Sequence, residues 1–142
     1  METATETRKY YAFDEVREWP MVDGWSVCPD DSSFRVSCDR EARIDPSVLF
    51  GRGATVKAEA VVEAGAMVES GAVVESGAVI RADAVIGAGA VVGPWARVGA
   101  GAVVKAGAAV CTWAMVGSGA IIGFDAVVGS RAVVESGEVV EA

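Results

Sequence analysis

The chain has 142 residues, the length of one domain of ordinary size. Apolar residues make up 52% of it, but they are spread along the chain as alanine and valine, so no run approaches the ~20 apolar residues that a membrane helix needs. Twelve basic and twenty acidic residues give a net charge of -8, which opposes binding to nucleic acid or to anionic lipid. We therefore expect neither a membrane span nor direct contact with nucleic acid.

The segment that precedes Ala42 is rich in aromatic side chains. It lacks the basic start and apolar stretch of a secretory signal, so we expect a cytoplasmic protein. The composition is typical of a cap over the end of a repeat array, because terminal repeats need cover, and a partner-binding arm is the alternative. Six of the ten aromatic residues lie in this segment: Tyr10, Tyr11, Phe13, Trp19, Trp25 and Phe34.

From Ala54 onward the chain repeats every six residues without insertion or deletion. The first place of each hexad is almost always alanine, the third is always valine or isoleucine, and the last three are rich in turn-forming residues. Residues two apart in a strand point to the same side, so each hexad predicts a short strand with an inward pair, followed by a turn. The same register extends back through Phe50 and Ile44, so the repeat begins near Val36 or Ala42.

The segment Val-Gly-Ala-Gly-Ala-Val at residues 98–103 fits the motif of the hexapeptide-repeat superfamily, which the whole repeat resembles. The resemblance implies an all-β fold, a left-handed parallel β-helix of triangular section with three hexads to a coil. We expect five to six such coils. The predicted organisation is an N-terminal cap or arm over residues 1–41 and a β-helix over residues 42–142.

The second residue of each hexad faces outward, and these residues form three largely apolar rows. An extended apolar surface usually marks an interface, although outward valine also follows from β-propensity alone. Members of the resembled superfamily are commonly trimers packed side by side, so the resemblance implies a homotrimer. The row without any polar or small member is the candidate surface for self-association or a protein partner: Met67, Val85, Val103, Ile121 and Val139.

Trp95, Trp113 and Arg131 occupy the same place of the hexad, each separated from the next by three hexads. They are therefore expected to stack along one corner of the β-helix, as two indoles followed by a guanidinium. One interpretation is a recognition strip for a partner or a flat ligand. The alternative is that the column packs under the N-terminal segment or inside an oligomer.

The sequence contains no histidine, asparagine or glutamine. The superfamily includes acyltransferases and γ-class carbonic anhydrases, and both rely on histidine, so we expect no enzyme activity, no catalytic residue, no cofactor and no metal site. Asp83 and Asp125 occupy turn positions where aspartate is common. The three cysteines, Cys28, Cys38 and Cys111, have no CxxC spacing and are expected to be reduced thiols.

Three functions stay open at this point. The first is a non-catalytic scaffold or protein-interaction module that associates through its apolar faces, like hexapeptide solenoids that serve as assembly subunits or phage-associated proteins. The second is an acidic inhibitor, of the kind phages use against host defences, that blocks a nucleic-acid-binding target. The third is an atypical acyltransferase dependent on coenzyme A.

Overall fold

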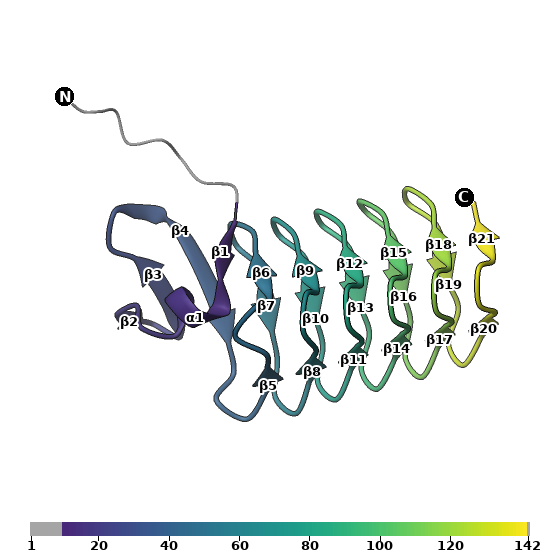
Figure 1. Ribbon diagram of the computed structural model, residues 1–142, viewed down its shortest axis with the longest axis horizontal. Helices are drawn as coiled ribbons and strands as arrows, with labels where there is room; N and C mark the ends of the chain where they lie inside the picture. Colours follow the sequence, from purple (N-terminus) through teal and green to yellow (C-terminus); the bar gives the residue numbers. More distant parts are fainter. Residues whose placement is uncertain (1–9, 142) are drawn as a thin grey trace.

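The computed structural model describes residues 10–141, and the expectations for residues 1–9 lie outside this range. The chain forms a rod of parallel stacked coils with a small cap at one end (Figure 1). Its single described helix is one turn, α1 (Phe13–Val16). The predicted all-β solenoid is confirmed, with about six coils of about 18 residues. Among the described residues, no helix is long and apolar enough to cross a bilayer.

Each coil contributes one short strand to each of three parallel sheets, which we name by their first solenoid strand. The β4 face contains β4 (Asp31–Cys38), β7 (Thr55–Val56), β10 (Val73–Val74), β13 (Val91–Val92), β16 (Ala109–Val110) and β19 (Val127–Val128). The β5 face contains β5 (Arg43–Ile44), β8 (Val61–Val62), β11 (Val79–Ile80), β14 (Arg97–Val98), β17 (Met115–Val116) and β20 (Val133–Val134). The β6 face contains β6 (Leu49–Phe50), β9 (Met67–Val68), β12 (Val85–Ile86), β15 (Val103–Val104), β18 (Ile121–Ile122) and β21 (Val139–Val140).

Neighbouring coils are held in register at a spacing of three hexads. On the β5 face, Val79 pairs with Arg97 and Ile80 with Val98. The amide of Val79 donates to the carbonyl of Ala96 at 2.9 Å, and the amide of Arg81 donates to that of Val98 at 2.9 Å. Because every coil repeats these bonds, residues three hexads apart stand directly above one another on all three faces.

The inward pair of each hexad forms one continuous core. The small first residue and the branched third residue are buried from Ala54 to Val128, with relative exposures of 3% or less. A β-branched side chain fits the pleated wall of a strand, while alanine leaves room for the branched residues of the other faces. The predicted inward positions are therefore confirmed over this range.

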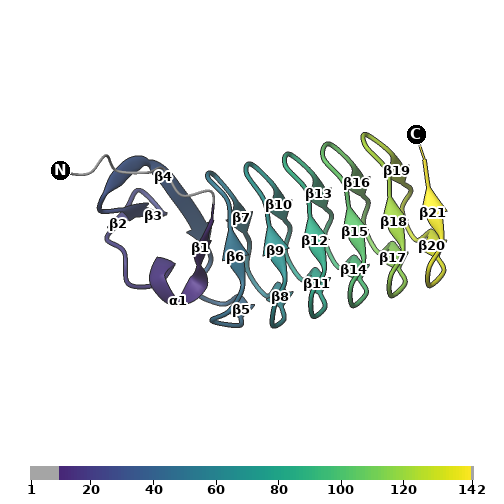
Figure 2. The same ribbon diagram turned by 45° about the horizontal axis from the view of Figure 1, so that its top comes forward.

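The described part of the N-terminal segment lies at the end of the rod beside the first coil (Figure 2), and its aromatic side chains pack against the core. β1 (Tyr11–Ala12) pairs antiparallel with β6, while β2 (Met21–Val22) and β3 (Trp25–Cys28) add antiparallel strands beside β4. Phe34 is buried and makes edge contacts with Tyr11 at 4.7 Å and Trp19 at 6.0 Å between ring centroids. The described part of the segment thus packs on the end of the core. The division at residue 42 stays a prediction, while the parallel ladder already includes Ser37 and Cys38.

The three edges of the rod are made by tight turns of one kind. In the turn after β13, the amide of Ala96 donates to the carbonyl of Gly93 at 3.1 Å, and Trp95 has a φ of 63°. A hydrogen bond across four residues with a positive φ at the third is the type II β-turn, and Pro94 holds the second position, where proline is favoured. From Ala54 onward, the sixth place of the hexad always adopts the left-handed conformation that this turn requires.

The core predicts a sharp contrast between adjacent residues of β11. Replacing the buried Ile80 by alanine removes three methyl-sized groups from a close-packed interior and is expected to lower the free energy of unfolding by about 2–5 kcal/mol. The matched change Val79→Ala, on the outward side of the same strand, is expected to cost less than about 1 kcal/mol. Guanidinium denaturation of the two variants measures the difference, and equal losses would contradict the inward and outward assignment.

Candidate functional site

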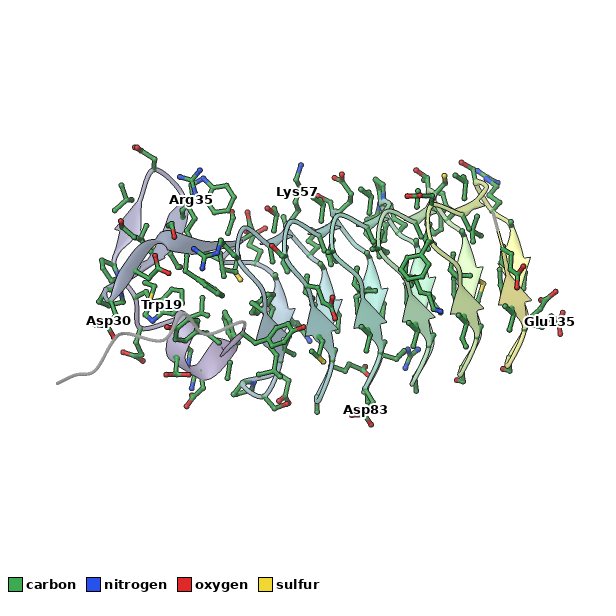
Figure 3. All side chains as sticks on the ribbon, turned by 90° about the horizontal axis from the view of Figure 1, so that it is seen from above. Trp19, Asp30, Arg35, Lys57, Asp83 and Glu135 are labelled. Carbon is green, nitrogen blue, oxygen red and sulfur yellow. The ribbon has the colours of Figure 1, made fainter. Side chains whose placement is uncertain are left out.

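Two stacked tryptophans form the most unusual feature of the rod's surface. Trp95 follows β13 and Trp113 follows β16, so both lie on the edge between the β4 and β5 faces. Their ring centroids are 5.7 Å apart and their planes differ by 13°, as expected of a parallel stack. Lys57, labelled in Figure 3, belongs to an earlier turn of this edge, while Asp83 lies on the edge between the β5 and β6 faces. The structure thus brings together two of the residues that the sequence placed in one column.

Both tryptophans occupy a backbone conformation that disfavours large side chains. Their φ values are 63° and 65°, whereas glycine holds most of the sixth places of the hexads from Ala54 onward. The left-handed conformation costs roughly 1–2 kcal/mol for a residue with a Cβ atom. The indole of Trp95 lies over Gly77 of the preceding coil, because a Cβ atom added there would meet the ring at 2.5 Å. Such strain, kept at two successive coils, suggests a role for the side chains themselves.

Exposed apolar side chains gather around these two tryptophans. Trp95 and Trp113 are 45% and 52% exposed, so the described part of the N-terminal segment does not cover them. Among the described residues, ten large apolar side chains are exposed, and six of them lie on this edge or on the two strands beside it. We call this set the aromatic edge: Val91, Trp95, Trp113, Met115, Val127 and Val133.

The same edge changes from charged to apolar along the rod. In its first half Lys57 pairs with Glu75 at 3.5 Å. In its second half the cations are Arg97 and Arg131, and neither has a carboxylate within 4 Å among the described residues. Because residues 84–131 contain three basic residues and one acidic residue, this stretch is weakly positive in a chain of net charge -8. Acidic groups are therefore concentrated away from the aromatic edge.

A shallow groove of 490 Å³ lies on the β5 face next to the aromatic edge. Arg97, Met115 and Val133 are outward residues of β14, β17 and β20 on its floor. Its far side is formed by the turns that follow these strands, which contain Gly99, Ala100, Gly117, Ser118, Glu135 and Ser136. Sequence reasoning missed this groove, although the run of glycine, alanine and serine on one edge was a visible signal.

The predicted surface row lies where the sequence placed it, but it is mostly half-buried. Met67, Val85, Val103 and Ile121 form one outward ladder on the β6 face, and only Val139 at its end is exposed. Its role as an interface stays a prediction. Arg131 shares the column of Trp95 and Trp113, yet the structure describes no cation–π contact between its guanidinium and either indole.

Cys28, Cys38 and Cys111 are all free, and no three carboxylate or thiol groups among residues 10–141 are placed to hold one metal ion. Burial raises the pKa of the Cys38 thiol to about 12. Hydrogen bonds from Ser33 lower the pKa of Asp31, and those from Ser47 lower the pKa of Asp45, so both aspartates serve their own turns.

The sequence matches no protein-family model and no curated protein. Several solved structures are similar to this chain. The acetyltransferase domain of PglB from Neisseria gonorrhoeae, in complex with acetyl coenzyme A, is 29% identical, with 75% of this chain and 54% of that chain covered and a TM-score of 0.44. PerB from Caulobacter crescentus, in complex with coenzyme A and GDP-perosamine, is 28% identical, with coverages of 72% and 52% and a TM-score of 0.44. A hexapeptide transferase family protein from Anaplasma phagocytophilum is 17% identical, with coverages of 77% and 75% and a TM-score of 0.45.

The chain spans about half the length of the first two of these proteins. In its repeat and its fold the chain resembles the hexapeptide-repeat superfamily. From Ala54 it has fourteen full hexads and a fifteenth lacking one residue in one register, with three hexads to a coil.

These structures correct the expectation that the chain is not an enzyme. That expectation rested on the missing histidine, but solved structures similar to this chain are acetyltransferases with coenzyme A bound. The physical reason is that the absence of imidazole removes only one kind of general base, since carboxylate, amine, phenol and thiol groups also transfer protons. The missing histidine therefore does not by itself exclude enzyme activity.

The strained turns predict that Trp95→Gly leaves the monomer nearly as stable as before. The change loses a ring stack worth about 0.5–1.5 kcal/mol and relieves a left-handed conformation that costs roughly 1–2 kcal/mol. We expect the free energy of unfolding, measured in guanidinium on a dilute sample, to change by less than about 1 kcal/mol. A loss comparable with that of Ile80→Ala would show that the indole is needed for folding.

Cys38 is expected to be unreactive in the folded chain. With a pKa of about 12, almost none of its thiol is ionised at pH 8, whereas in the unfolded chain the pKa returns to about 8.5. Alkylation by iodoacetamide at pH 8, followed by peptide mass spectrometry, should be roughly a thousandfold slower at Cys38 in the native chain than in guanidinium. Equal rates in the two states would contradict the burial of this thiol.

Proposed function

We propose that this chain is a protein-interaction β-solenoid that assembles side by side with further copies of itself through the aromatic edge. The observation that carries the proposal is the aromatic edge itself. Two half-exposed indoles in left-handed turns are surrounded by exposed valine and methionine side chains. A contiguous apolar surface with aromatic anchors is typical of an interface, where tryptophan supplies much of the binding energy.

The distribution of charge supports a second copy as the partner. Copies of a chain with a net charge of -8 repel one another over most of their surface. Five of the six residues of the aromatic edge lie within the weakly positive stretch of residues 84–131, which is the part of the rod where two copies meet with the least repulsion. Self-association there buries the exposed apolar side chains and leaves the acidic ends in water.

A homotrimer is the assembly that we favour, since members of the hexapeptide-repeat superfamily commonly pack side by side in threes. The three-sided section of the rod suits such an arrangement, because each copy presents an edge and a face to its neighbours.

Size-exclusion chromatography with light scattering tests the proposal on the full chain. We expect three times the chain mass of 14.5 kDa over a dilution series. Because the contact is apolar, the mass should be the same in 0.1 M and 1 M salt, whereas an assembly held by ion pairs would dissociate as the Debye length falls from about 10 Å to 3 Å. A mass of one chain at every concentration would contradict the proposal.

A further inference from the structure

The aromatic edge and the groove on the β5 face lie at the same height of the rod. Trp95 is followed within five residues by Arg97, Gly99 and Ala100 of the groove, and Trp113 by Met115, Gly117 and Ser118. Each coil that carries a tryptophan therefore also carries a section of the groove. A neighbour related by an axis parallel to the rod would bring the indoles and the groove together without any shift along the rod.

The shape of the far side of the groove leaves room for large side chains. In the earlier coils, the edge between the β5 and β6 faces carries Glu63 and Arg81, which pair at 3.9 Å, and then Asp83. At the height of the tryptophans, the turns of that edge contain only glycine, alanine and serine, at residues 99–101 and 117–119. At this height, the edge between the β4 and β5 faces thus carries the bulky tryptophans, and the edge between the β5 and β6 faces carries small residues.

The floor of the groove has the chemistry that an indole favours. Arg97 has no carboxylate within 4 Å among the described residues, so its guanidinium is free to lie over an aromatic ring. Met115 stands next to Arg97 in the ladder and is 46% exposed, so its thioether is available for contact with a ring edge. Val133 completes an apolar floor.

We propose that Trp95 and Trp113 of one copy insert into the β5-face groove of the next copy, against Arg97 and Met115. This rests on the proposed self-association and assigns its two surfaces. The contact is heterologous, because the tryptophans of one copy meet the groove of another. In a ring of three rods, the directions from one rod to its two neighbours differ by about 60°. Seen from the centre of a triangular section, a corner and the middle of the adjoining face also differ in direction by about 60°. The contact therefore closes into a trimer instead of growing into a filament.

Mixing two complementary variants tests this pairing on the full chain. W95G/W113G removes the indoles and introduces glycine, the residue that Gly77 supplies at this position in the preceding coil, while leaving the groove intact. M115E places a charge on the groove floor at an outward position, beside Arg97 in the ladder, while leaving the indoles intact. We expect each variant alone to have the mass of one chain, and the equimolar mixture at high concentration to have the mass of two, because one intact tryptophan–groove contact remains and the ring cannot close.

Two matched controls lie in the coil that contains Trp113. Phe124→Ala removes another exposed aromatic ring from a different edge, and Ile121→Glu charges the outward residue of the β6 face. Both are expected to retain the mass of the wild-type chain.

The outcomes separate this pairing from self-association in general. A wild-type chain of single-chain mass overturns both. A trimeric wild type whose W95G/W113G and M115E variants remain trimeric overturns only the tryptophan–groove pairing. Dissociation by Ile121→Glu in place of M115E would move the interface to the β6 face, and variants that dissociate but do not form a pair on mixing would show that the contact is not heterologous.

Discussion

The stacking of residues three hexads apart is the constraint on which the rest of the structure depends. Parallel backbone hydrogen bonds, such as that from the amide of Val79 to the carbonyl of Ala96, fix each coil over the preceding one. Residues at the same place of every third hexad therefore form a column along the rod. Alanine and valine at inward places become a continuous core. A tryptophan at an outward turn becomes part of a stack, and a glycine or serine becomes part of a groove. The surface of this rod is thus a set of columns whose chemistry changes along its length, while its interior stays the same.

The six-residue period of the sequence predicted almost all of the buried core residues, because burial in a coil depends only on the alternation of side chains within a strand. It also predicted the column of Trp95 and Trp113. It did not predict which outward residues are exposed. Val85 and Met115 hold the same place of the hexad, yet Val85 is half-buried on the β6 face while Met115 is exposed above a groove. Met115 differs in its neighbours, which are Arg97 in the same ladder and the turns that line the groove, and a six-residue period does not describe these neighbours.

The two tryptophans connect the fold with its proposed use. A type II turn places its third residue in the left-handed conformation, which glycine adopts without strain and tryptophan does not. The fold therefore gains little from an indole at this position. An interface gains more, since a half-exposed indole on a rigid edge loses little conformational freedom when a partner covers it.

The central claim is that a second copy covers Trp95 and Trp113. The fluorescence of a W19F/W25F variant, in which these two are the only tryptophans, tests it most directly, because indole emission shifts to the blue when water is excluded. The account predicts blue-shifted emission, protected from quenching by acrylamide, at concentrations where the mass corresponds to three chains, and a red shift on dilution to single chains. Emission typical of a half-exposed indole in the assembled state would contradict it.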